Sequence, residues 1–214
     1  MESIFENFKG NDTLVVAFQA HDTSVFGTSV DEFKGVLNQL EYDTLKINDI
    51  NGEYFFNGID VNNNSFEKVL NLLSGYTKNY TKVVFIGNCA GGHAAILFGT
   101  LLNIQKVIGF NTVTYLDQET LILNNDGRQN QVTFLDQSNE YLNLKPYLDN
   151  TTYDTQIYSL VAQNHDRHIN QSNNISTCNN VTIELINSTT PQVGLYLMKQ
   201  NLLIPKINSI IESN

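Results

Sequence analysis

The chain has 214 residues, of which 41% are hydrophobic and 16% charged, a composition typical of a globular protein. Its formal net charge of −10 leaves no Lys- and Arg-rich face, which argues against a nucleic-acid partner and against docking on an anionic membrane. The sequence contains no apolar stretch long enough to span a bilayer. We therefore expect a partner that is a small molecule or a protein, with no nucleic acid and no membrane.

The two cysteines, Cys89 and Cys178, are too few for a disulfide-stabilised secreted scaffold. The N-terminal residues show no cationic region followed by an apolar run, so we expect no signal peptide and a cytoplasmic setting. The histidine and cysteine spacing fits no zinc pattern. We expect neither a metal nor a cofactor.

Strands and helices alternate in the first part of the chain. Continuous apolar runs indicate strands buried on both faces, and apolar residues at helical spacing indicate amphipathic helices. These patterns predict a strand at Leu14–Phe18, a helix at Val30–Leu40, a strand at Asp43–Ile47, a loop at Asn48–Asn64 and a helix capped by Ser65.

The middle and last parts continue the alternation. They predict a strand at Lys82–Ile86, a tight turn at Gly87–Gly92, a helix at His93–Leu102 and a strand at Lys106–Phe110. The less regular stretch Asn111–Asp154 includes a small strand at Gln131–Leu135. After it come a strand at Gln156–Val161, a helical or loop segment from Asp166, a strand at Val181–Ile186 and a closing helix from about Val193, interrupted at Pro205.

This order predicts an α/β fold with a mainly parallel central sheet and helices on both faces. No linker or internal repeat divides the chain, so we expect a single domain over residues 1–214. The irregular stretch 111–154 is expected to form a cap or an edge of that domain.

The motif Gly-x-Cys-x-Gly-Gly, at Gly87–Gly92, lies between a buried strand and an apolar helix. In a nucleophile elbow, such a strand–turn–helix holds its central residue in a strained conformation and exposes its side chain above the carboxyl edge of the sheet. The following helix N-terminus favours a thiolate on Cys89. The Ala90 N–H is then the first oxyanion donor, and the second is expected near Ala20, after the first strand.

Two other interpretations of this turn exist. Cys89 could be a small, inert core residue, since free cysteines are often buried. A phosphate-binding turn is disfavoured because the Lys-Ser/Thr ending of a P-loop and the Gly-x-Gly-x-x-Gly spacing of a dinucleotide site are both missing.

The segment from Val83 to Gly99 resembles the elbow of a family of small bacterial α/β hydrolases found beside polysaccharide and cell-surface glycosylation genes. The loop Asp49–Ile59, the strand segment Asn180–Leu185 and the helix segment Leu195–Leu197 are similar to other parts of that family. A cysteine at the central position of the elbow is also similar to the elbow of dienelactone hydrolases, which has the pattern Gly-x-Cys-x-Gly-Gly. The resemblance implies the α/β-hydrolase fold, with an acid after the penultimate strand and a histidine after the last strand.

The sequence has an acid at the expected place but no histidine after the last strand. Asp166 follows the penultimate strand, whereas the loop after the last strand, at 187–192, contains Pro191 and no histidine. The remaining candidates for the base are His165 and His168, beside Asp166, and His21, after the first strand. A cysteine depends less on a base than a serine does.

Two functions follow from these residues. In the first, Cys89 attacks an ester or thioester carbonyl, the Ala90 amide stabilises the oxyanion, and Asp166 orients the histidine that serves as base. The resemblance implies acylated carbohydrate as a substrate class. In the second, the chain is a relative of the hydrolases that has lost the base and binds a ligand or a protein partner.

Overall fold

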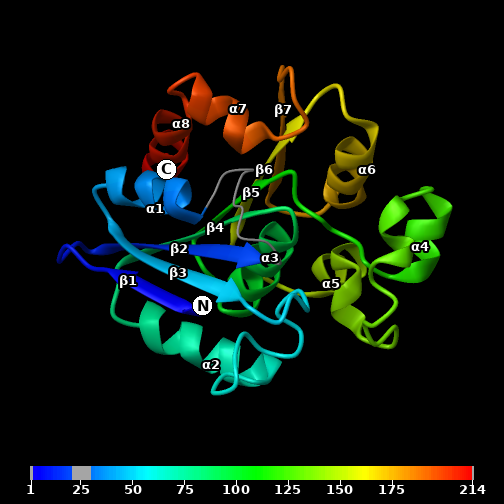
Figure 1. The fold of residues 1–214 in the computed structure, drawn as a ribbon, viewed down its shortest axis with the longest axis horizontal. Coiled ribbons are helices and arrows are strands. Elements are labelled where there is room, and N and C mark those ends of the chain that lie inside the picture. The colour runs from blue at the N-terminus through cyan, green and yellow to red at the C-terminus, as the bar shows by residue number, and fades with distance from the viewer. Residues whose placement is uncertain (1, 21–29, 214) are drawn as a thin grey trace.

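The computed structural model describes residues 2–20 and 30–213, and the described strands form a single seven-stranded sheet (Figure 1). The strand order is β1-β3-β2-β4-β5-β6-β7, with β1 antiparallel to β3 and every other neighbouring pair parallel. The strands are β1 (Ile4–Asn7), β2 (Thr13–Ala20), β3 (Asp43–Asp49), β4 (Lys82–Asn88), β5 (Lys106–Phe110), β6 (Gln156–Ala162) and β7 (Val181–Ile186).

Helices connect these strands. They are α1 (Val30–Gln39), α2 (Phe66–Thr77), α3 (Ala90–Leu101), α4 (Gln118–Leu123), α5 (Leu144–Asn150), α6 (Asp166–Ile175), α7 (Val193–Lys199) and α8 (Leu203–Glu212), with two 3₁₀ turns, η1 (Gly127–Asn130) and η2 (Glu140–Leu142). The Ser65 hydroxyl accepts the Lys68 N–H at the start of α2, which is the cap that the sequence predicts.

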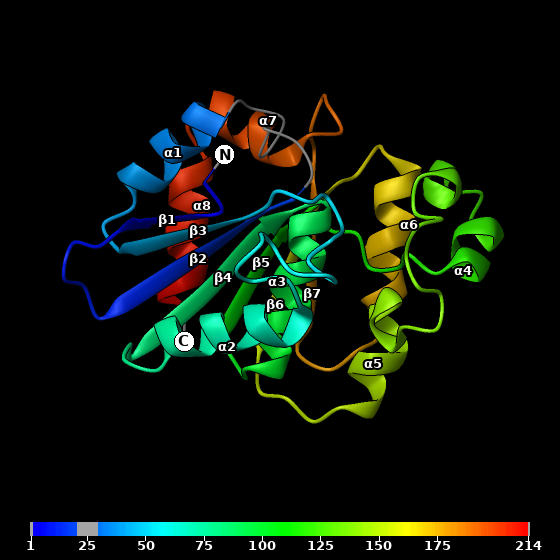
Figure 2. The same ribbon diagram turned by 60° about the horizontal axis from the view of Figure 1, so that its bottom comes forward.

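Alternate residues of the central strands face opposite layers of helices, so both faces of the sheet are apolar. In β2, Leu14 and Val16 pack in the core under α2, α3, α5 and α6, whereas Val15 and Ala17 pack in the core under α1, α7 and α8. Figures 1 and 2 show α1, α7 and α8 on one side of the sheet and α2 on the other. This arrangement confirms the predicted α/β class, a mainly parallel sheet covered on both faces.

Two expectations differ from the structure, and one strand was missed. Residues 131–135 form a turn and not a strand. The closing helix is interrupted at 200–202, and Pro205 lies within the first turn of α8, where a missing N–H is tolerated. The edge strand β1 was not predicted. The cap or edge stretch 111–154 contains α4, η1, η2 and α5, and its organisation with the rest as one domain stays a prediction.

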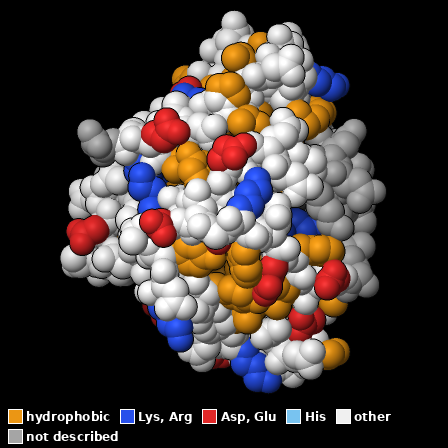
Figure 3. Space-filling view, turned by 90° about the vertical axis from the view of Figure 1, so that its left-hand side faces the viewer, with side chains coloured by type: hydrophobic (Ala, Val, Ile, Leu, Met, Phe, Trp, Pro, Cys, Tyr) orange, Lys and Arg blue, Asp and Glu red, His pale blue; other side chains and the backbone are white. Residues whose placement is uncertain are grey.

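On the face shown in Figure 3, Lys and Arg side chains are scattered among Asp and Glu side chains, and apolar side chains gather at the level of β1 and α2. Within the described ranges, no helix has both the length and the apolar character needed to cross a bilayer.

Replacing Gly91 by alanine is expected to destabilise the fold by about 3 kcal/mol. A Cβ at Gly91 would lie 2.2 Å from the carbonyl oxygen of Phe18, so α3 and β2 would have to separate. The matched control is Gly75→Ala in α2, where a Cβ meets no atom within 4 Å and the helix gains roughly 0.5–1 kcal/mol. Urea unfolding measures both changes, and wild-type stability of Gly91→Ala would contradict this packing.

Candidate functional site

The turn between β4 and α3 holds Cys89 in a conformation that is rare for a non-glycine residue, with φ 53° and ψ −116°. Its backbone is fully engaged. The Cys89 N–H donates to the Phe110 carbonyl at 2.9 Å, and the Cys89 carbonyl accepts the N–H groups of Gly92, His93 and Val113 at 3.1, 3.3 and 3.1 Å. These hydrogen bonds hold Cys89 in its strained backbone conformation.

The small residues on either side of Cys89 are required by close backbone packing. A Cβ at Gly87 would lie 2.2 Å from the Gly91 carbonyl oxygen, and one at Gly91 would meet the Phe18 carbonyl at the same distance. The chain can therefore reverse direction between β4 and α3 only with glycine at both positions.

The thiol of Cys89 is exposed at the N-terminus of α3. Among the described residues, the N–H groups of Ala90 and Gly91 donate to no acceptor. Unpaired amides at a helix N-terminus attract negative charge. The turn thus places a nucleophilic atom beside donors that can bind an oxyanion.

The other cysteine has a different environment. Cys178 is buried, and its thiol donates to the Asp149 carboxylate at 3.3 Å. Burial, followed by the nearby Asp149, raises the pKa of the Cys178 thiol to about 11, so it stays protonated and unreactive at neutral pH. Of the two thiols, Cys89 is the chemically available one.

His165 and His168 form a stacked pair at the start of α6. Their ring centroids are 4.2 Å apart, and both Nδ1 atoms are buried without a hydrogen-bond partner among the described residues. Burial, followed by the positive charges of His165, Arg167 and Arg128, lowers the pKa of His168 to about 4. His168 is therefore neutral at pH 7. Neither imidazole forms a hydrogen bond with Cys89 in the described part of the chain.

The remaining predicted site residues are placed as follows. Asp166 lies exposed in the first turn of α6, and no hydrogen bond joins its carboxylate to another described side chain. Ala20 is the last residue of β2. His21 lies outside the described residues. The roles of these three residues stay predictions.

The loop after β7 is held to the sheet through one of its backbone carbonyl groups. The Asn111 side chain, just beyond β5, donates from Nδ2 to the carbonyl of Pro191 at 2.7 Å. Asn111 also donates its N–H to the Leu160 carbonyl of β6 at 2.9 Å. A carbonyl of this loop therefore lies at the carboxyl edge of the sheet, in the part of the chain where the resemblance implies an imidazole.

A buried ion pair, missed by sequence reasoning, lies in the 111–154 stretch. Arg128 donates from NH1 to Asp126 Oδ2 at 2.7 Å, with side-chain exposures of 6% and 1%. Gln171 of α6 donates to the same carboxylate at 3.2 Å and accepts the Thr114 N–H at 2.6 Å. Because Thr114 follows Val113, this network adjoins the Cys89 turn.

Tyr54, in the loop after β3, is a second residue that sequence reasoning missed. Burial, followed by the nearby Cys89 thiol, raises the pKa of its hydroxyl to about 12, while the charge of Arg128 opposes this rise. The hydroxyl forms no hydrogen bond with another described residue. Its position inside the Asp49–Ile59 segment, which resembles a family loop, was the only signal available in the sequence.

His93 is fully buried four residues after Cys89. Its Nδ1 lies 3.1 Å from the Val113 carbonyl and its Nε2 lies 3.0 Å from the Tyr141 carbonyl. Burial lowers the pKa of His93 to about 4, against the opposing effect of the two carbonyls. The neutral imidazole has one N–H to donate to one of these two carbonyls, and the buried side chain is not available to a substrate.

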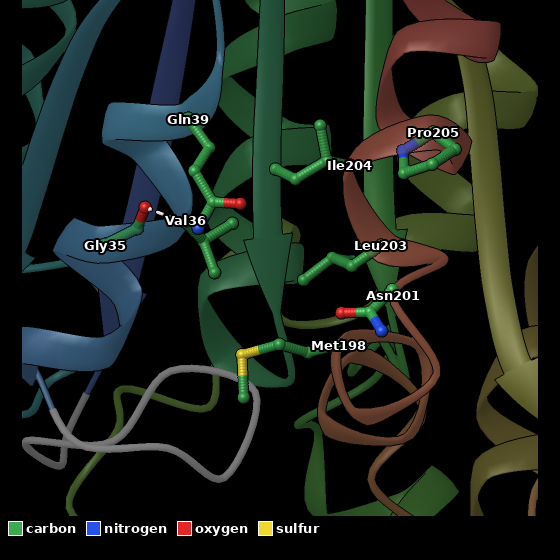
Figure 4. A pocket seen from close by; sticks show the side chains of 8 residues that line it. All are labelled: Gly35, Val36, Gln39, Met198, Asn201, Leu203, Ile204 and Pro205. Carbon is green, nitrogen blue, oxygen red and sulfur yellow. Dashed lines mark hydrogen bonds between the residues drawn. The ribbon is translucent and has the colours of Figure 1, made fainter.

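A groove of about 400 Å³ between α1 and the α7–α8 segment is shown in Figure 4. It is lined by Gly35, Val36, Gln39, Met198, Asn201, Leu203, Ile204 and Pro205. None of these side chains can transfer a proton or act as a nucleophile. The groove therefore does not compete with the Cys89 turn as a catalytic site. Over the described residues, no group of three or more His, Cys, Asp or Glu could hold a metal ion.

The strand order and the sharp β4–α3 turn define the α/β-hydrolase fold. Solved structures with this fold align over most of the chain. The capsule O-acetyltransferase of Neisseria meningitidis serogroup A has a TM-score of 0.68 and 15% identity, covering 98% of this chain and 90% of the other. No family model and no curated protein sequence matches the chain.

Two further structures align comparably. A lipase-esterase related protein from Clostridium acetobutylicum has a TM-score of 0.59 and 13% identity, covering 96% of this chain and 98% of the other. MGS-MChE2, an α/β-hydrolase enzyme from a lagoon-sediment metagenome, has a TM-score of 0.59 and 15% identity, covering 96% and 94%. At these identities the likeness shows the fold alone, an α/β-hydrolase-like fold.

Removing the acid of the buried ion pair is expected to destabilise the protein strongly. Asp126→Asn leaves the Arg128 guanidinium buried without a counter-charge, which costs about 3–5 kcal/mol. The control is Asp149→Asn in the exposed Lys145–Asp149 pair, where the loss stays below about 1 kcal/mol. Urea unfolding compares them, and equal losses would show that the buried pair adds nothing to the fold.

His93 makes stability depend on pH. Between pH 6.5 and 4, the unfolded chain binds a proton at this imidazole that the folded chain does not, so stability falls as the pH falls through that window. The free energy of unfolding is expected to drop by about 3 kcal/mol more in the wild type than in His93→Gln. Urea titrations at several pH values measure this difference, and parallel profiles for the two proteins would contradict it.

Proposed function

We propose that this chain carries out thiol-dependent acyl transfer, with Cys89 as the nucleophile of an elbow. The observation that carries the proposal is the exposed thiol on a strained turn, next to two unpaired amides at the start of α3. The α/β-hydrolase fold supports it, because this fold presents a nucleophile at the same strand-to-helix turn. An acyl ester or thioester is the substrate class that these groups suit.

In the first step the Cys89 sulfur attacks the carbonyl carbon, forming a C–S bond. The carbonyl oxygen gains negative charge, which the Ala90 N–H stabilises as an oxyanion donor. The bond to the leaving alcohol or thiol then breaks and leaves an acyl-cysteine. Water, or the hydroxyl of an acceptor, attacks that thioester and releases the Cys89 thiolate.

The His165–His168 pair is the proposed source of the base. Both residues follow β6, and the carboxyl ends of parallel strands meet at the edge of the sheet where Cys89 lies. A neutral imidazole can accept a proton from the thiol or from the attacking water, but the lowered pKa of His168 makes it a weak base, so His165 is the preferred member of the pair. The capsule O-acetyltransferase among the similar structures supports an O-acyl ester as donor or a hydroxyl as acceptor, and the sequence resemblance implies that this oxygen belongs to a carbohydrate.

A specific observation favours a second candidate function, binding without catalysis. No described imidazole is bonded to the Cys89 sulfur, and the loop after β7 presents the Pro191 carbonyl to Asn111. A relative without a working base would retain the fold and use the exposed site to bind a ligand or a protein partner.

Replacing Cys89 distinguishes the two functions. Cys89→Ala is expected to reduce turnover of p-nitrophenyl acetate and of an acetyl thioester by at least about 100-fold, because the acyl-cysteine cannot form. The matched control is Cys178→Ala, which removes the buried thiol and leaves turnover intact. Mass spectrometry of the intact protein detects the acetylated Cys89. Undiminished turnover in Cys89→Ala, or no acylation of the wild type, would favour the binding function.

A further inference from the structure

The loop that follows β3 is folded around a buried carboxylate. Asp49 Oδ1 accepts the N–H groups of Asn51 and Gly52 at 3.2 and 3.0 Å, and Oδ2 accepts the N–H of Phe55 at 3.0 Å. The Asp49 side chain is held at the end of β3, where Asp49 pairs with Ala20 of β2. The loop is therefore an ordered structure fixed to the carboxyl edge of the sheet.

Two consecutive aromatic residues of this loop have left-handed backbones. Tyr54 has φ 57° and Phe55 has φ 67°, in a region that bulky side chains rarely adopt. Such strain persists only where the surroundings impose it, and it concentrates at functional sites. The Asp49 hydrogen bonds and the burial of the Phe55 ring, which is 1% exposed, impose it here.

The ring of Phe55 places the loop beside the Cys89 turn. It packs edge-on against Phe18, with ring centroids 5.6 Å apart. The carbonyl of that same Phe18 contacts Gly91, two residues after Cys89. Tyr54 directly precedes Phe55, so its backbone belongs to the segment that packs against this turn.

The Tyr54 side chain is partly buried, and its hydroxyl forms no hydrogen bond with any other described residue. Burial, and after it a negative charge at Cys89, raises the pKa of this hydroxyl, while the charge of Arg128 opposes the rise. With a pKa of about 12 it keeps its proton at neutral pH. A protonated phenol near the nucleophile, with no partner of its own, is available as a hydrogen-bond donor to a substrate.

We propose that Tyr54 is a catalytic residue that donates its proton to the leaving group expelled from Cys89. This inference rests on the proposed acyl transfer and supplies a proton donor that the loop after β7, without a histidine, does not provide. As the bond between the acyl carbon and the leaving oxygen or sulfur breaks, the leaving atom takes the electron pair and the Tyr54 proton. The resulting phenolate then removes a proton from the water that attacks the acyl-cysteine, and Cys89 leaves as thiolate.

The test uses two esters that differ in how much they need a proton donor. p-Nitrophenolate leaves readily as an anion, whereas an alkoxide leaves only when it is protonated. Tyr54→Phe is therefore expected to lower acylation of Cys89 by ethyl acetate by about 100-fold, and by p-nitrophenyl acetate less than about threefold. Rates are followed by mass spectrometry of the intact protein. Because the hydroxyl has no described partner, its removal is expected to leave the thermal unfolding midpoint unchanged.

The control is Tyr76→Phe, which removes the same atom from a tyrosine on α2 whose hydroxyl donates to Glu6. It is expected to leave both rates unchanged. If Tyr54→Phe lowers the acylation rates of the two esters equally, Tyr54 only shapes the site. If both rates are unchanged, Tyr54 has no role. Either result overturns the inference while the proposed function stands. If neither ester acylates Cys89 in the wild type, the proposed function fails, and the inference fails with it.

Discussion

The Cys89 carbonyl is an acceptor shared between two parts of the molecule. It receives N–H groups from Gly92 and His93 of α3 and from Val113 of the 111–154 stretch, while the Cys89 N–H donates to Phe110 at the end of β5. A residue with positive φ is unfavourable by itself, and these bonds offset that cost. Strand, helix and overlying segment are therefore held in one arrangement around the exposed thiol.

The same arrangement explains why so much polarity is buried around the site. The Asp126–Arg128 pair and Gln171 sit in an environment where each lost partner leaves a charge or an amide unsatisfied. Such a network tolerates only one geometry. Together with His93, which lies between the Val113 and Tyr141 carbonyls, it adds polar contacts to the apolar core that the 111–154 stretch shares with the sheet.

Local patterns predicted the β4–turn–α3 unit because its strand, glycines and helix are contiguous in sequence. The edge strand β1 has only four residues and is defined by antiparallel pairing with β3, a contact between residues about 40 positions apart. The 131–135 segment has strand-forming residues, but Val132 and Leu135 instead bury their side chains from an irregular turn. From the sequence, Asp126 and Arg128 look like exposed loop charges, because their burial and the contact from Gln171 of α6 depend on residues distant in the sequence.

The absence of a histidine after β7 and the presence of cysteine at the turn are chemically consistent with each other. A serine nucleophile requires an imidazole twice, to remove its proton and to protonate the leaving group. A thiol loses its proton far more easily, so the first requirement is weaker, and the second can be met by any well-placed acid. A phenol that keeps its proton at neutral pH suits that second requirement, because it remains a donor until a strongly basic leaving group forms beside it. In the proposed mechanism the strained loop at Tyr54 and the strained turn at Cys89 would act together, the loop held by the Asp49 carboxylate and the turn by its backbone hydrogen bonds.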